Sequence, residues 1–167
     1  MRVHHEIYRE LFLTTRQMNL LKKLEQTKVR TSDYFELSED ELSRTYASGK
    51  WNIRFILHHL ADTETILFDR IRRVISKPRQ VIWDFDQDAW ANSLNYEKRP
   101  LQLSSKLFTS TRAGIIYYAG LHYEKDGDLE FVHSRTGTRT LRQEFEKVAS
   151  HNQKHLDQIK QALSAAL

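Results

Sequence analysis

The sequence predicts an all-α protein, a four-helix bundle with one long crossover connection. Only five glycines and two prolines occur in 167 residues, which is too few for the many tight turns of a small sandwich or barrel. Four long segments carry apolar residues at three- and four-residue steps, the period of an amphipathic helix. Residues 79–100 separate the second and third of these segments and supply the crossover.

The length and composition are those of one globular domain. A chain of 167 residues with 40% hydrophobic residues is long enough to bury a sizeable core. No Pro-rich, Gly-rich or low-complexity linker divides it, so we expect a single domain over residues 1–167. There is no cysteine, which excludes disulfides and thiolate metal sites and leaves imidazole, carboxylate and water as metal ligands.

Charge and hydropathy argue against nucleic-acid and membrane partners. The net charge of +4 comes from basic residues that are interspersed with acidic ones, and the run at residues 70–73 is better explained as a solvated helix surface. No stretch approaches the ~18 apolar residues of a membrane span, and residues 1–7 lack the features of a signal peptide. We therefore expect a cytoplasmic protein.

The first helix is predicted over residues 5–27. Its apolar residues recur at helical spacing without an intervening Pro or Gly; they are Tyr8, Leu11, Phe12, Leu20, Leu21 and Leu24. Residues 33–48 form a polar connection, in which Ser38 followed by Glu41 is the signature of a capping box and predicts one short helix. Gly49 and Lys50 close this loop.

The second helix is predicted over residues 53–75, with Asn52 as its N-cap and Pro78 just past its end. Its apolar stripe is spaced by three and four residues and consists of Ile56, Leu60, Thr63, Leu67, Ile71 and Val74. His59 lies about 60° from the centre of this stripe, so it can enter the bundle. His58 lies on the opposite side and is expected at the surface.

The aromatic residues of the long connection are predicted to cover one end of the bundle, with a short helix over residues 86–92. The third helix is predicted over residues 103–123, although Gly114 weakens it. Residues 125–128 form a turn, and residues 129–139 form an irregular segment or a brief hairpin around Gly137. Thr140 is placed to cap the fourth helix, which begins near Leu141.

The fourth helix carries two histidines four residues apart. Its inward stripe includes His155 and has His151 at its edge; the stripe consists of Leu141, Phe145, Val148, Asn152, His155, Ile159 and Leu163. Two such imidazoles lie one turn apart and can reach one metal ion, although two core histidines with polar partners would give the same pattern. The inward-facing His59 favours the metal, and three neutral imidazoles leave a coordination position open, as in catalytic sites.

These motifs resemble the DinB-like (DinB/YfiT) superfamily. They are Gly49-Lys50-Trp51-Asn52, His59-Leu60-Ala61-Asp62 and the pair His151 and His155; Phe85-Asp86, Trp90 and residues 137–141 also fall where the family tends to have similar residues. The resemblance implies an antiparallel four-helix bundle in which His59, His151 and His155 hold a divalent metal such as Zn, Ni, Fe or Mn. Phe55 departs from the pattern, because relatives often carry Glu three residues after the capping residue.

The resemblance implies a metal-dependent enzyme that activates a thiol or water, of the S-transferase or hydrolase type. Characterised relatives include S-transferases that use bacillithiol or mycothiol and a maleylpyruvate isomerase. The expected partner is a small-molecule substrate such as a low-molecular-weight thiol, and a homodimer is compatible with this interpretation. The alternative is a non-catalytic dimeric bundle for interaction or stress, with a structural metal or none. The sequence assigns no catalytic residue.

Two interpretations are possible for each of Asp62, His122 and His133. Asp62, one turn from His59, is placed either to orient the free ring nitrogen of His59 or to contact the loop of Trp51. His122 and His133 can approach the site, but a structural role is the commoner one for a lone histidine. His4 and His5 are expected to be exposed to solvent.

Overall fold

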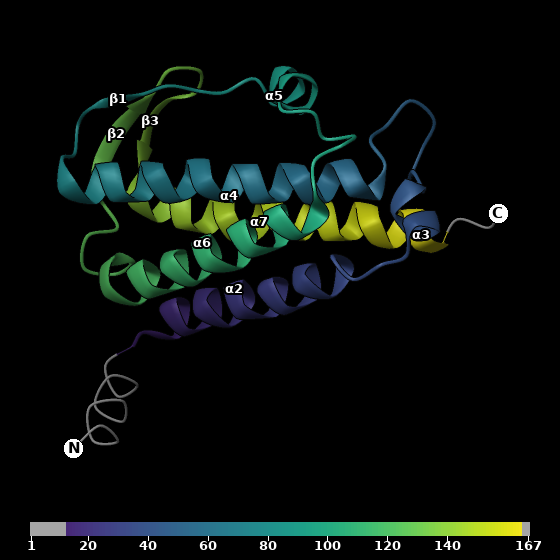
Figure 1. The fold of residues 1–167 in the computed structure, drawn as a ribbon. Helices are drawn as coiled ribbons and strands as arrows, with labels where there is room; N and C mark the ends of the chain where they lie inside the picture. The colour runs from purple at the N-terminus through teal and green to yellow at the C-terminus, as the bar shows by residue number, and fades with distance from the viewer. Residues whose placement is uncertain (1–12, 165–167) are drawn as a thin grey trace.

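Four long helices form the molecule and confirm the predicted four-helix bundle (Figure 1). The structure is a computed structural model that describes residues 13–164. The long helices are α2 (Thr15–Tyr34), α4 (Ile53–Ser76), α6 (Leu101–His122) and α7 (Leu141–Ser164). None of the described helices is long and apolar enough to cross a bilayer.

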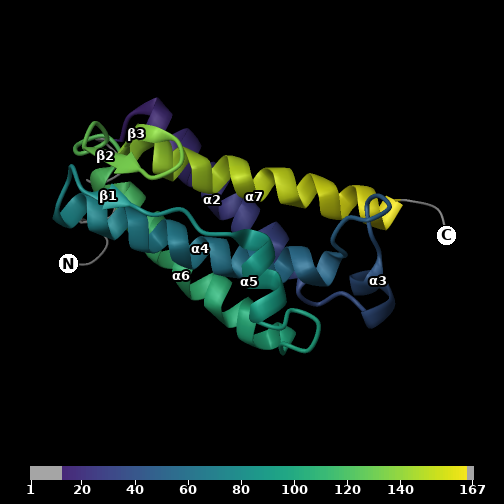
Figure 2. The same ribbon diagram turned by 90° about the horizontal axis from the view of Figure 1, so that it is seen from above.

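The long crossover sets the direction of the helices. After α4 the chain passes back over the outer side of that helix, through the short helix α5 (Gln87–Ser93), before α6 begins (Figures 1 and 2). As a result α4 and α6 run in the same direction, while α2 and α7 run the opposite way (Figure 1). The α4 and α7 pair, which carries the three predicted ligand histidines, is therefore antiparallel.

The first helix extends further than predicted. The structure continues α2 from Thr27 to Tyr34, and residues 5–12 of the predicted helix lie outside the described residues, as do His4 and His5. The hydroxyl of Thr31 donates to the backbone oxygen of Thr27 at 2.8 Å, so this polar group is satisfied within the helix. Both threonines are buried and face polar partners on other helices, so the polar sequence here does not end the helix.

The loop before α4 is built as the sequence predicts. The short helix α3 (Glu39–Ser43) begins with the capping box of Ser38 and Glu41. Gly49 has a φ of +69°, a left-handed conformation that glycine adopts without strain. The side-chain oxygen of Asn52 then accepts a hydrogen bond from the Phe55 backbone nitrogen at 2.9 Å and caps α4.

Gly114 permits the close approach of α6 to α4. A Cβ atom at this position would lie 2.8 Å from the ring of Phe68, well inside van der Waals contact. The glycine that weakens the helix prediction is thus explained by packing between the two parallel helices.

The crossover contains a strand that the sequence analysis did not predict. β1 (Val81–Ile82) pairs in parallel with β2 (Glu130–His133), which pairs antiparallel with β3 (Gly137–Thr140). The predicted short helix is present as α5 (Gln87–Ser93), and the predicted hairpin is present as β2 and β3. The Thr140 hydroxyl accepts from the Gln143 backbone nitrogen at 3.3 Å, so Thr140 caps α7 as predicted.

Two apolar clusters fill the bundle, and a polar layer lies between them. One cluster contains Leu67, Ile71, Phe145 and Val148, and the other contains Ile56, Leu60 and Ile159. Between them along α4 and α7 lie Glu64 and Asn152, both buried. Buried polar groups need partners, and here Glu64 binds Arg112 while Asn152 binds Thr31. The three predicted ligand histidines lie beside this layer.

Candidate metal centre

Three histidine side chains from two helices converge at one point. The Nε2 atoms of His59 and His151 lie 3.2 Å apart, and the Nε2 atoms of His155 and His151 also lie 3.2 Å apart. One ring nitrogen from each residue lies within 4.8 Å of the other two. The structure therefore brings together the three residues that the sequence predicts as metal ligands.

The backbone explains this convergence. His151 and His155 are separated by one turn of α7 and share a face. His59 comes from the antiparallel helix α4 and is buried, whereas the two histidines of α7 are partly exposed. The cluster thus has a protein-facing side and a solvent-facing side.

Neighbouring side chains fix the orientation of the rings. The Nδ1 atom of His155 lies 2.7 Å from Oε1 of Gln158, and because an amide oxygen only accepts, Nδ1 carries the proton. The Nε2 atom of His155 is then an unprotonated acceptor that faces the other two rings. The indole of Trp51 packs against His59 with ring centroids 5.1 Å apart, which gives the tryptophan of the loop a role in positioning His59.

All three histidines are held neutral. Burial, together with the nearby His155, lowers the pKa of His59 from 6.5 to about 3. Burial and the adjacent imidazoles lower the pKa of His151 to about 2. Burial also lowers the pKa of His155 to about 4, although its bond to Gln158 acts in the opposite direction. Neutral imidazole is the form that binds a metal ion.

The metal-free protein is expected to lose stability as the pH falls from 6.5 to about 5. The unfolded chain protonates these histidines near pH 6.5, whereas the folded chain does so only near the lowered values. The unfolded state then binds more protons, and the free energy of unfolding falls by up to about 1.4 kcal/mol per pH unit for each histidine. Urea unfolding across this range measures the slope. It should be shallower in His151→Ala, and identical slopes would contradict the neutral cluster.

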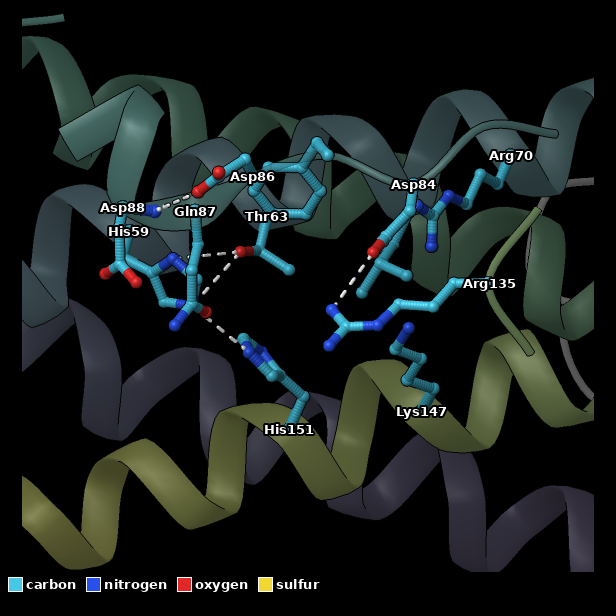
Figure 3. Close-up of a pocket in the computed structure, with 12 residues that line it drawn as sticks. His59, Thr63, Arg70, Asp84, Asp86, Gln87, Asp88, Arg135, Lys147 and His151 are labelled. Atoms are coloured by element: carbon cyan, nitrogen blue, oxygen red, sulfur yellow. Dashed lines mark hydrogen bonds and ion pairs between the residues drawn. The ribbon is translucent and has the colours of Figure 1, made fainter. Parts of the chain in front are cut away.

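A cavity of about 620 Å³ opens beside the cluster (Figure 3). His59 and His151 lie in its wall at one end, near Asp86, Gln87 and Asp88 of the crossover (Figure 3). A second cavity of about 490 Å³ reaches His151 and His155 from the other side. Gln87 and Asp88, at the start of α5, line both cavities. The connection does not cover one end of the bundle with its aromatic residues as predicted; it runs along α4 (Figure 1), and Trp83 is 77% exposed.

His58 is not at the surface, and the prediction for it was wrong. Its side chain is fully buried, and its Nδ1 atom lies 2.8 Å from the hydroxyl oxygen of Ser104 on α6. The helical wheel assumed one buried face for α4, but α6 and α7 pack on different faces of this helix. His58 faces α6, away from the cluster.

Asp62 orients neither His59 nor the loop of Trp51. Its carboxylate accepts from the hydroxyl of Tyr96 at 2.6 Å and from Nη1 of Arg99 at 2.8 and 2.9 Å. Asp62 therefore ties the end of the crossover to α4. Both readings made from the sequence are wrong, because the partners lie more than thirty residues away in a segment whose path the sequence does not reveal.

His122 and His133 have structural partners outside the cluster. His122 Nδ1 lies 2.6 Å from a carboxylate oxygen of Asp126. His133 Nδ1 accepts from the backbone nitrogens of Arg135 and Thr136. Among residues 13–164, only His59, His151 and His155 form a group of three or more His, Asp or Glu side chains that converge in this way.

The fold and the histidine cluster define a helical-bundle protein with a candidate metal centre. The sequence matches the DinB superfamily over residues 23–159, and the chain belongs to this family. It is 31% identical over 128 residues to an Oceanobacillus iheyensis protein named "Putative metal-dependent hydrolase OB0413", covering 77% of this chain and 73% of the relative.

Two further similarities agree with this assignment. A Halalkalibacterium halodurans protein named "Putative metal-dependent hydrolase BH0277" is 25% identical, over 76% of this chain and 74% of the relative. The structure of YfiT from Bacillus subtilis, described as a probable metal-dependent hydrolase with an unusual four-helix bundle topology, matches with a TM-score of 0.81. At 18% identity, with 90% of this chain and 87% of that chain covered, this match concerns the fold.

Proposed function

We propose that the protein is a metal-dependent hydrolase whose divalent metal is held by His59, His151 and His155. The observation that carries the proposal is the convergence of three neutral imidazoles on the wall of an open cavity. The names of the curated relatives support a hydrolase. Imidazole suits Zn, Ni and Fe among the expected metals, and the ligand set does not choose between them.

Two of the three pairs of ring nitrogens have the separation of ligands on one metal ion. Two ligands at 2.0–2.1 Å from a tetrahedral ion lie about 3.3 Å apart, and two pairs of Nε2 atoms here are separated by 3.2 Å. Hydrogen bonds between rings are a poor alternative, because Nε2 of His155 carries no proton and His151 can donate to only one of its two neighbours. When bound, a divalent ion on three imidazoles acts as a Lewis acid and supplies a nucleophile at neutral pH.

The residues around the cluster position the histidine rings and line the cavity beside them. Gln158 and Trp51 hold the rings of His155 and His59 in place, and such outer contacts are needed for affinity. Thr63 lines the cavity, and its hydroxyl oxygen lies 3.4 Å from Nε2 of His59, so it adjoins the proposed metal site. Within the described residues no fourth His, Asp or Glu joins the cluster, which favours an open coordination position over a closed structural site.

An S-transferase would use the same centre with a thiol in place of water. The chain has no cysteine, so the thiol would be a small molecule that enters the cavity. This reaction is the second candidate, because a divalent ion lowers the pKa of a bound thiol as it does that of a bound water.

A turnover assay tests the proposal and separates the two reactions. The metal-loaded protein is offered small ester, amide and phosphoester substrates with and without an added low-molecular-weight thiol. We expect turnover that chelation removes and metal restores, and that occurs without the thiol. Turnover that requires the thiol would indicate the transferase. Turnover that survives both chelation and His151→Ala would contradict a role for the cluster.

A further inference from the structure

The larger cavity has a positively charged end, opposite Asp86 and Asp88. Arg70, Arg135 and Lys147 line this end, whereas Asp86 and Asp88 lie beside the histidines at the other end (Figure 3). The three cations come from α4, the loop between β2 and β3, and α7. Folding therefore gathers them from distant parts of the sequence.

The carboxylates around these cations do not balance their charge. Asp84 lies 3.5 Å from Arg70 and 3.4 Å from Arg135. Glu144 lies 3.9 Å from Arg70 and is held more closely by Arg139, at 2.8 Å. With Lys147 the group contains four cations and two carboxylates, a surplus of two positive charges.

Two of the cations have unused hydrogen-bonding capacity. The Arg70 side chain is only 2% exposed, and its buried Nε atom has no hydrogen-bond partner within the described residues. Lys147 is partly buried and likewise makes no side-chain hydrogen bond there; burial lowers the pKa of its ammonium group. Arg70 has Asp84 and Glu144 nearby, whereas Lys147 is a partly desolvated cation without such a partner and is stabilised by an anion.

The location of Lys147 connects this charge to the histidine cluster. Lys147 precedes His151 by four residues on α7, so both residues lie on one face of the helix with Cβ atoms about 5–6 Å apart. An anion bound by Lys147 would hold the rest of a small molecule beside the ring nitrogens. Guanidinium groups such as those of Arg70 and Arg135 match the oxygen atoms of carboxylate and phosphate.

We propose that the cationic end of this cavity, Lys147 with Arg70 and Arg135, binds an oxyanion of the substrate, a carboxylate or a phosphate. Because Lys147 lies one helical turn from His151, the anion and the reacting bond belong to one short substrate. The role in substrate binding rests on the proposed function. The anion site itself does not, because it is built from side chains other than the three histidines.

Calorimetric titration of the metal-free protein with inorganic phosphate and, separately, with acetate tests the site without interference from a bound metal. We expect the wild type to bind at least one of these probes and Lys147→Gln to weaken binding at least about tenfold, the value of one hydrogen bond to a charged group. Lys147→Arg should retain most of the affinity. The matched control is Lys160→Gln, an exposed lysine of the same helix, which should leave binding unchanged.

Arg135→Gln provides a second variant, because its exposed side chain can be replaced without disturbing the core; it should also weaken binding. A preference for phosphate supports a phosphorylated substrate, and a preference for acetate supports a carboxylate. Equal affinity in the wild type and Lys147→Gln, or no binding of either probe, would overturn the site. Zinc titration of the same proteins distinguishes the two proposals: phosphate binding that depends on Lys147 in a protein that takes up no zinc would leave the anion site intact and refute the metal centre.

Discussion

His59→Ala is expected to weaken divalent-metal binding by more than about a hundredfold, whereas His58→Ala keeps it. Loss of an outer partner of a metal ligand alone costs about 10–100-fold, and His59 supplies one of only three imidazoles in the cluster. His58 is the adjacent residue and is equally buried, but its Nδ1 atom bonds Ser104 on α6. The two variants thus distinguish the loss of a metal ligand from the loss of a buried histidine that does not bind the metal.

Zinc titration of the two purified variants and the wild type measures this difference. His58→Ala should instead lower the free energy of unfolding by about 1–3 kcal/mol, because Ser104 is left without its buried partner. The zinc titrations are therefore run well below the unfolding temperature of both variants. Equal losses of affinity would mean that zinc binding reports the integrity of the bundle rather than coordination by His59.

Glu64→Ala is expected to have the largest effect on stability, a loss of about 3–5 kcal/mol. Glu64 and Arg112 are both buried, and the guanidinium Nε donates to the carboxylate at 2.9 Å. Arg112 also donates to the hydroxyl of Thr27 at 2.8 Å and so joins α2, α4 and α6. Removal of the carboxylate leaves a charged guanidinium in the core without its ion-pair partner.

The matched control is Glu39→Ala, which breaks an ion pair with Arg54 at the surface. Glu39 is 85% exposed, and exposed pairs contribute about 0–1 kcal/mol. Urea unfolding of both variants gives the comparison. A double variant, Glu64→Leu with Arg112→Met, should recover much of the loss, since apolar side chains replace both charges. Similar stabilities of Glu64→Ala and Glu39→Ala would show that the buried pair is not needed.

The cluster was predictable because helical geometry fixes which residues share a face. The spacing of His151 and His155 places both rings on one side of α7, and the stripe of α4 turns His59 inward. The capping residues Ser38, Asn52 and Thr140 were predictable for a similar reason, because each acts on backbone groups two or three residues away.

The burial of His58 and the partners of Asp62 were not predictable in this way. A helical wheel describes one helix, whereas α4 is covered on several sides by other elements. His58 is buried by α6, and Asp62 is engaged by Tyr96 and Arg99 at the end of the crossover. Such contacts depend on the path of the chain through space, which periodicity does not contain.

The short strand β1 and the cationic end of the cavity were likewise not predictable, because both depend on contacts between distant segments. β1 has two residues and exists only because β2, some fifty residues later, offers a free edge. The cations at the end of the cavity come from three separate elements. Only Lys147 carried a local signal, since it stands four residues before His151 on the same helix face.

X-ray absorption spectroscopy of the zinc-loaded wild type tests the metal centre most directly, because it reports the ligands of the ion themselves. The three converging rings predict three imidazole nitrogens at about 2.0–2.1 Å and one further light atom from water or buffer. His151→Ala should lose one imidazole from this shell or fail to bind zinc. A shell made of carboxylate oxygens, without the scattering pattern of imidazole rings, would contradict the assignment of His59, His151 and His155 as the ligands.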